Sequence, residues 1–418
     1  MATPGLERRQ LTLGGAVSSA AEGPAVELAP PPQPTTPVEW LRQNLLSSWF
    51  NAVLTVISGT FVIFVLYQAV SFVFVDAQWE VVRANMKGYM VGGFPLEEVW
   101  RVWACAYLVA ALAGTSVGST RRRLRWTAGR AVVVLVAAVG ATSIVLFTTQ
   151  TALVRGLAAG LATAAAAGVA AGRLGGGSLR RPLLVAWVLS FPAVVVIVRG
   201  FDGVPPQLWE GFFFNLVAAW VGIFASFPIG IALALGRRSD LPAVRTVCVG
   251  FIELFRGVPL VAWLIFSKYV VDLLLPPQAE LPDIFKAFIA MTLFSAAYVG
   301  EIVRGGLQGV SSGQYEAARA LGLSTMKMMV LVVLPQALRS TIPAMIGHFI
   351  SLFKDTSLFT AIEVTDLLSA ARRSSSSLEF FGTDMETLLF AALLFWVIAF
   401  SMSRWSQRLE VRLGVGSR

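Results

Sequence analysis

One connector between two long apolar runs reads Gly313-Gln314-Tyr315-Glu316-Ala317-Ala318-Arg319-Ala320-Leu321-Gly322-Leu323-Ser324 and continues to Val332-Val333-Leu334-Pro335. Its polar and apolar residues alternate with helical rather than strand periodicity, which predicts a short amphipathic helix. Tyr315, Ala318 and Leu321 are three residues apart, so we expect them on one face of that helix. The stretch therefore predicts an exposed helix that connects two membrane segments.

Other residues of this connector favour contact with a second protein. Glu316 is expected near the N-terminus of the helix, where the helix dipole stabilises an anion. Ala317 and Ala318 add little side-chain bulk, so another surface can approach the backbone closely. Gly322 permits a sharp turn after the helix, and a second short helix is expected to lead to Pro335 in the next apolar run.

The composition around the connector is that of a membrane protein. Of the 418 residues, 56% are apolar and 14% are charged. Soluble domains carry roughly a quarter charged residues, and disordered chains carry more charge and less apolar surface. The composition therefore excludes a soluble multidomain enzyme and a chain disordered throughout.

Ten apolar runs are long enough to cross a bilayer core of about 30 Å as helices. Backbone groups in lipid must be hydrogen-bonded within their own segment, so these runs are expected to be helices rather than strands. The predicted fold is all-α and polytopic, with about ten transmembrane helices at residues 50–75, 99–118, 131–149, 151–171, 183–199, 210–235, 250–274, 284–303, 328–348 and 386–403.

The net charge of +9 is explained by the positions of the basic residues. With ten spans and both termini in the cytoplasm, five basic clusters lie on the cytoplasmic side, as the positive-inside rule requires. Arg372 and Arg373 lie on the opposite side and are the exception. The positive charge therefore does not indicate binding to nucleic acid, and we expect the chain to be surrounded by membrane lipid.

Composition also divides the chain into three parts. Residues 1–48 form a tail rich in Ala, Pro, Gly and Ser, which we expect to be disordered. Residues 49–205 form an N-terminal transmembrane extension, rich from about residue 120 onward in Ala, Val, Gly and Arg and poor there in acidic residues. Residues 206–418 form a second transmembrane domain, which contains the connector helix and more aromatic and acidic residues.

The connector resembles a known signature. It is similar to the EAA motif of ABC importer permeases, which reads Glu-Ala-Ala, three residues, Gly, nine residues, an aliphatic residue, one residue and Leu-Pro. Further matches to the polar amino-acid branch are Glu253-Leu254-Phe255-Arg256-Gly257-Val258-Pro259-Leu260, Ala297-Tyr298-Val299-Gly300-Glu301-Ile302-Val303-Arg304-Gly305-Gly306-Leu307 and Leu352-Phe353-Lys354-Asp355-Thr356-Ser357-Leu358. The resemblance covers residues 209–405, and the long N-terminal half is similar to permeases of the general L-amino-acid type.

This resemblance implies a type I importer permease in a bacterial inner membrane. The implied partners are a second permease subunit forming a heterodimer, two ABC ATPase subunits and a soluble amino-acid-binding protein. Tyr315, Glu316, Ala317, Ala318, Leu321 and Gly322 would couple the chain to the ATPase. ATP and Mg would be bound by that ATPase, and no cofactor by this chain.

The sequence also argues against two other classes of protein. It has no Gly-x-x-x-x-Gly-Lys-Ser/Thr loop, two cysteines and a single histidine, which leaves little basis for an enzyme. An ion-coupled secondary amino-acid transporter is the alternative, but residues 49–205 contain no second copy of the EAA half, as inverted repeats would require.

Ionisable residues in the spans give further candidates. Glu301 and Arg304 are three residues apart and are expected to brace the connector. Lys354 and Asp355 supply a cation and an anion for a zwitterionic substrate, with Thr356 and His348 as further pathway candidates. Equally, Lys354 and Asp355 could pair with each other or cap a short helix, and His348 could be a packed neutral imidazole.

Three other groups are given structural interpretations. Glu253 and Arg256 are expected to form a structural pair or to serve an interface. Lys268 is expected to reach the lipid headgroups from its apolar span. Trp209 and residues 212–214, all phenylalanine, are expected to anchor the chain at the membrane interface.

Overall fold

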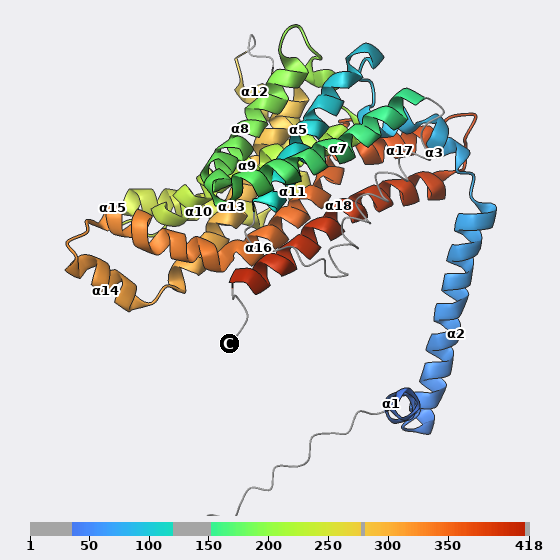
Figure 1. Cartoon of the computed structure of the whole chain (residues 1–418), viewed down its shortest axis with the longest axis horizontal. Helices are drawn as coiled ribbons and strands as arrows, with labels where there is room; N and C mark the ends of the chain where they lie inside the picture. The colour runs from blue at the N-terminus through green and yellow to red at the C-terminus, as the bar shows by residue number, and fades with distance from the viewer. Residues whose placement is uncertain (1–35, 120–151, 277–280, 414–418) are drawn as a thin grey trace, which may run out of the picture. The chain divides into compact units, whose positions relative to one another are not determined.

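The computed structural model describes residues 36–119, 152–276 and 281–413, and every regular element within them is a helix (Figure 1). Two compact units divide the chain after Asp76. The first contains α1 (Pro37–Asn44) and α2 (Trp49–Ser71), whose N-caps are Thr36 and Ser48. The predicted boundary between residues 205 and 206 stays a prediction.

The second unit contains the remaining helices. They are α3 (Glu80–Ala84), α4 (Met86–Val91), α5 (Val99–Gly118), α7 (Ala152–Gly175), α8 (Arg180–Arg199), α9 (Gly211–Gly236), α10 (Pro242–Gly257), α11 (Leu260–Tyr269), α12 (Val271–Leu274), α13 (Asp283–Gln308), α14 (Ser312–Ala320), α15 (Thr325–Met328), α16 (Leu334–Asp355), α17 (Leu367–Ser375) and α18 (Asp384–Leu413).

The all-α membrane fold is confirmed. Within the described ranges, seven helical segments are long and apolar enough to cross a membrane, and a bent pair of helices makes an eighth. The predicted span 151–171 is the 24-residue helix α7, which is not among these segments. The predicted span 131–149 lies outside the described residues.

The bent pair corrects one prediction, because residues 250–274 do not form a single continuous span. Helix α10 ends at Gly257, α11 begins at Leu260, and the two are bent by 102°. Pro259 lacks a backbone N–H, and the residue before a proline is pushed out of the helical region. Val258 has φ −120° and ψ 135°, as this restriction requires.

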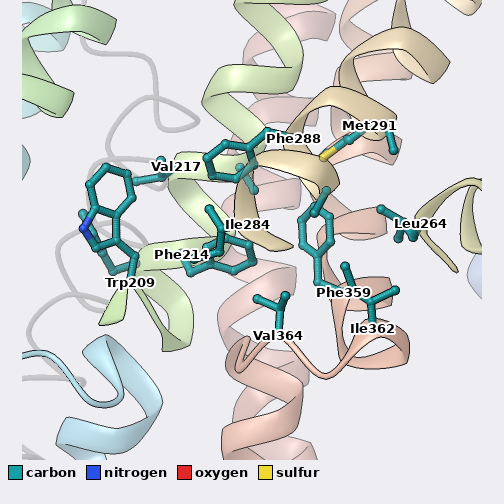
Figure 2. Packing of buried hydrophobic residues seen from close by; sticks show 14 of the residues in the cluster. Trp209, Phe214, Val217, Leu264, Ile284, Phe288, Met291, Phe359, Ile362 and Val364 are labelled. Atoms are coloured by element: carbon teal, nitrogen blue, oxygen red, sulfur yellow. The ribbon is translucent and has the colours of Figure 1, made fainter. Parts of the chain in front are cut away.

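Helix α13 is the central helix of the second unit, with 72% of its most apolar window buried. It packs against α9, α10, α11 and α16. The core beside it is aromatic (Figure 2), and the ring of Phe214 stacks on Phe288 at 5.7 Å and meets Phe359 edge-on at 5.2 Å.

The predicted role of Trp209 and residues 212–214 as interfacial anchors is wrong. Trp209 is 2% exposed, Phe214 is fully buried, and Phe212 and Phe213 are buried beside them. The indole N–H of Trp209 donates to the carbonyl oxygen of Val204. These aromatic side chains have core partners from several helices, so they pack within the protein rather than at its rim.

Helices α5 and α7 approach each other closely along a row of small residues. A Cβ atom on Gly114 would overlap the carbonyl oxygen of Ala165, and one on Gly168 would overlap that of Ala111. Small residues allow this backbone approach between membrane helices. This packing holds α7 against α5.

Candidate functional site

The EAA stretch forms α14, which lies with α15 at one end of the second unit (Figure 1). Glu316 and Ala317 are exposed, whereas Ala318 is only 2% exposed and Tyr315 is half-buried. The helix is therefore attached to the protein by one face and presents the other outward.

Two details of the predicted helix are wrong. Leu321 does not share the attached face, because α14 ends at Ala320 and Leu321, its C-cap, is 79% exposed. Glu316 is not in the first turn, since the helix begins at Ser312, which places Glu316 fifth. Its carboxylate therefore lies beyond the turn in which the helix dipole acts most strongly.

The expected turn and second helix are confirmed. Gly322 has φ +73°, a conformation that glycine adopts without steric cost. After the short α15 the chain forms a π-helical turn at Met329–Val333 and enters α16, with Pro335 in its first turn.

Tyr315 attaches α14 to the end of α13 and to Arg238, which follows α9. Its hydroxyl donates to the carbonyl oxygen of Leu307 at the end of α13 and accepts from Arg238 Nη1, at 3.2 and 3.1 Å. The guanidinium of Arg238 also lies over the tyrosine ring, 5.8 Å from its centroid. Arg238 belongs to one of the basic clusters that the sequence analysis assigned to topology, so its contact with Tyr315 was not predicted.

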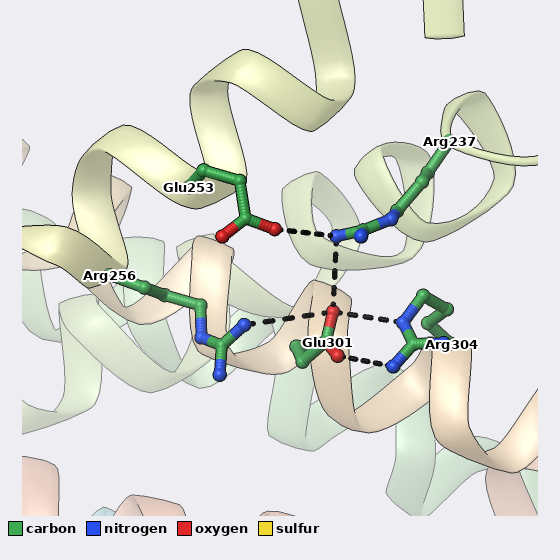
Figure 3. A network of polar contacts seen from close by, with 5 residues as sticks. All are labelled: Arg237, Glu253, Arg256, Glu301 and Arg304. Carbon is green, nitrogen blue, oxygen red and sulfur yellow. Dashed lines mark hydrogen bonds and ion pairs between the residues drawn. The ribbon is translucent and has the colours of Figure 1, made fainter. Parts of the chain in front are cut away.

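Glu301 lies at the centre of a charge network close to α14 (Figure 3). Arg304 binds both carboxylate oxygens, one of them through Nε at 2.9 Å. Arg237 Nη1 from the end of α9 lies 3.3 Å from Glu301 and 3.2 Å from Glu253, and Arg256 Nη1 lies 3.8 Å from Glu301. The network thus joins α9, α10 and α13, and Glu253 and Arg256 meet other partners rather than each other.

Neither Glu301 nor Arg304 has a hydrogen bond or ion pair to α14 within the described part of the chain. Their link to the connector runs through two adjacent residues that follow α9, because Arg237 contacts Glu301 and Arg238 contacts Tyr315. The bracing role predicted for the pair stays a prediction, and the adjacent arginines are the residues that the sequence reasoning missed.

His348 lies in a polar contact between three helices. Its Nε2 is 2.9 Å from the hydroxyl of Ser295 on α13, which donates to Ser226 on α9. The imidazole stacks on the ring of Tyr298 with centroids 5.4 Å apart. Ser226 and Ser295 carried no signal in the sequence, because isolated serines are common in membrane helices.

The other pathway candidates are not gathered around His348. Lys354 is exposed and Asp355 is half-buried in the last turn of α16, and the two do not form an ion pair. The Asp355 side chain does not cap the following turn either. Lys268 binds Glu363 at 2.6 Å and the carbonyl oxygen of Ile362 at 2.9 Å, so it is ion-paired rather than reaching free into headgroups.

Thr356 belongs to a buried polar group that we call the Asn215 cluster: Asn215, Thr356, Asp366 and Ser369. The Asn215 amide donates to Thr356 Oγ1 at 3.0 Å and to Asp366 at 3.4 Å, and its oxygen accepts from the backbone N–H of Leu367 at 2.9 Å.

Asp366 caps α17 by accepting from the backbone N–H of Ser369 at 2.8 Å, and burial raises the pKa of its carboxyl. The Asn215 cluster therefore fastens α9, α16 and α17 together. Among the residues the structure describes, no group of three or more His, Cys, Asp or Glu side chains could hold a metal ion.

Residues 226–415 match the family model for "Binding-protein-dependent transport system inner membrane component". The chain is 33% identical to the inner membrane amino-acid ABC transporter permease protein YhdY of Escherichia coli, over 94% of this chain and 98% of the relative. It is 32% identical to the glutamate/glutamine/aspartate/asparagine transport system permease protein BztC of Rhodobacter capsulatus, over 92% and 96%.

A shorter relative, the probable glutamine ABC transporter permease protein GlnP of Bacillus subtilis, is 35% identical over 49% of this chain and 93% of its own length. These relatives are transport permeases rather than enzymes, and they favour an ABC permease over an ion-coupled transporter. Their family works with ATPase and binding-protein partners. The chain belongs to the family of binding-protein-dependent transport system inner membrane components and is a multi-pass permease subunit of an ABC transporter of the inner membrane.

Proposed function

We propose that this permease carries polar or general L-amino acids from a soluble binding protein into the cytoplasm, driven by ATP. The observation that carries the proposal is α14, an EAA-bearing helix held by Tyr315 and Ala318 with Glu316 and Ala317 turned outward. The amino-acid substrate class is supported by the names of the full-length relatives, which are amino-acid permeases.

The outward face of α14 docks on a partner ATPase, which binds the ATP and Mg. Glu316, Ala317, Leu321 and Gly322 form the contact, and the small Ala317 lets the partner approach the helix backbone. Tyr315 and Ala318 hold the helix to the bundle, so movement of the ATPase is passed on as a rigid-body shift.

Arg237 and Arg238 extend this coupling into the membrane helices. Arg238 contacts Tyr315, and its neighbour Arg237 contacts Glu301, where α9, α10 and α13 meet. In this proposal Glu301 and Arg304 brace the end of α13 against which α14 is held.

The wider assembly follows the same proposal. The chain pairs with a different permease subunit, two ATPases bind beneath the pair, and both termini are cytoplasmic. Residues 206–418 are the permease domain, 49–205 an added transmembrane extension and 1–48 an N-terminal tail, whose predicted disorder is wrong for residues 37–44 because they form α1. Lys354, Asp355, Thr356 and His348 remain substrate-pathway candidates, of which His348 lies between the helices that carry the coupling network.

The test is Glu316→Lys in the assembled transporter reconstituted into liposomes. Reversing the charge on the outward face should lower ATP-driven amino-acid import at least tenfold, while the subunit still inserts and assembles. Glu379→Lys is the matched control, because Glu379 is exposed in the connection between α17 and α18. Import at the wild-type rate by Glu316→Lys would contradict the coupling role.

A further inference from the structure

Arg372 and Arg373 are the basic residues that the topology pattern leaves unexplained. Both lie in the last turn of α17, and Arg373 lines a cavity of about 410 Å³ between α4, the start of α9 and α17. Its walls also include Asn85, Gly88, Glu210, Ser374 and Ser377. We call it the α4–α17 cavity.

The α4–α17 cavity lies at the end of the second unit opposite α14. Glu210 immediately precedes α9, whereas Arg237 at the other end of α9 joins the coupling network. The 26 residues of α9 span about 39 Å at about 1.5 Å per residue. In the proposed function α14 docks on the ATPase, which places the cavity at the end of the unit where the binding protein would deliver substrate.

The Glu210 carboxylate is positioned at the cavity without a cationic partner. The backbone N–H of Gly93 donates to its Oε2 at 2.6 Å, and within the described part of the chain Glu210 forms no ion pair. Gly92 has φ +56°, and a Cβ atom there would overlap the Glu210 side chain. A glycine at this position thus makes room for the carboxylate.

The Arg373 guanidinium is also held by a neutral partner. Its Nη2 donates to the hydroxyl of Thr365 at 2.9 Å, and it forms no ion pair with any described carboxylate. Ser374 lies beside it, fixed by the Tyr89 hydroxyl at 2.5 Å. One wall therefore offers a cation and another an anion, each with unused hydrogen-bonding capacity.

An α-amino acid has the complementary pair of charges. Its ammonium group can donate to a carboxylate, and its carboxylate can accept two parallel hydrogen bonds from a guanidinium. Small-molecule sites commonly have volumes of about 300–1,000 Å³, a range that includes this cavity. We propose that the α4–α17 cavity is a binding site for the zwitterionic head of an amino acid, with Glu210 binding the ammonium and Arg373 the carboxylate.

This inference rests on the proposed function for its substrate class, so its test uses an amino acid and two analogues that each lack one charge. Saturation-transfer NMR on the full chain in nanodiscs would compare L-glutamine with 4-aminobutanamide, which lacks the carboxylate, and with N-acetyl-L-glutamine, which lacks the ammonium. L-glutamine should bind at least tenfold more tightly than either analogue.

Two variants assign that binding to the cavity. Glu210→Gln keeps an acceptor for the Gly93 N–H, and both it and Arg373→Gln should weaken L-glutamine binding at least tenfold. Arg372→Gln is the matched control, because Arg372 adjoins Arg373 but does not line the cavity. Ser377→Trp fills the cavity without removing a charge and should abolish binding even if a charge variant fails to fold.

Equal L-glutamine binding by wild type, Glu210→Gln and Arg373→Gln would overturn the inference, as would equal binding of 4-aminobutanamide. Import by the assembled wild-type transporter separates this outcome from failure of the proposed function. If import occurs but the variants bind normally, the site is wrong and the function stands. If wild type binds L-glutamine through these residues yet imports no amino acid, the site stands and the function is wrong.

Discussion

The two ends of the second unit are fastened by different chemistry. Near α14, the network around Glu301 consists of charged side chains that are 22–58% exposed. At the opposite end, Asn215, Thr356 and Asp366 are fully buried and are joined by hydrogen bonds. One end is held by partly solvated ion pairs, and the other by a polar cluster shielded from water.

This difference implies different tolerance to movement. Ion pairs in contact with water contribute little, because solvent screens them and replaces lost partners. A buried group that loses its partner retains the full cost of desolvation. We infer that the α14 end can rearrange when the ATPase moves, whereas the Asn215 cluster keeps the opposite ends of α9, α16 and α17 together.

The largest expected effect comes from breaking the buried end. Asn215→Ala would leave the Leu367 N–H without its acceptor and remove the hydrogen bonds that Thr356 Oγ1 and Asp366 Oδ2 accept from the amide, so we expect the free energy of unfolding to fall by about 3 kcal/mol. Denaturant unfolding in detergent would measure it. The control is Asn85→Ala, which removes one hydrogen bond to the carbonyl oxygen of Val81. If Asn215→Ala lowered the free energy of unfolding as little as this control does, the Asn215 cluster would not be the stronger of the two fastenings.

A smaller effect is expected at the α14 end. Glu301→Gln leaves Arg237, Arg256 and Arg304 without their shared anion, yet these groups are partly solvated, so we expect a loss of about 1 kcal/mol. The loss should shrink in 0.5 M salt, where Coulomb interactions are screened. The control, Glu316→Gln, should not change the free energy of unfolding. If Glu301→Gln lowered that free energy as much as Asn215→Ala does, the two ends would not differ in how they are stabilised.

The smallest effect concerns pH. Burial raises the pKa of Asp366 above its unfolded value, so between the two values the folded protein holds the extra proton. The free energy of unfolding should therefore fall as pH rises through this interval and stay lower above it. Asp366→Asn should remove this decrease when thermal unfolding is measured at a series of pH values from 4 to 8. If the free energy of unfolding of the wild type instead rose with pH by an amount that Asp366→Asn removes, the folded protein would stabilise the carboxylate form of Asp366.

The docking helix was largely predictable from the sequence, because its features are local. The spacing of Tyr315 and Ala318 predicted the attached face, and Gly322 predicted the turn. Leu321 was misplaced because the end of a helix depends on capping contacts that a three-residue spacing does not encode. Val258 and Pro259 indicate the break between α10 and α11, but the long apolar run over residues 250–274 led to the prediction of one continuous span.

The buried polar contacts were not predictable in this way. Asn215 and Asp366 are about 150 residues apart in the chain and meet only when α9 and α17 pack. The aromatic residues beside Asn215 have the composition of interfacial anchors, and only their packing against Phe288 and Phe359 identifies them as core. Hydrophobicity records how strongly a side chain avoids water, but not whether lipid or protein replaces the water.

The sequence by itself determined the membrane environment, the helical class, the EAA connector and the permease family. These properties follow from composition and short-range spacing, which do not depend on how the helices pack. The tertiary structure alone decided which charges meet at Glu301, which polar groups are buried around Asn215, and which unpaired charges line the α4–α17 cavity. Such contacts join helices distant in the chain, so their energies depend on packing geometry rather than on any local pattern.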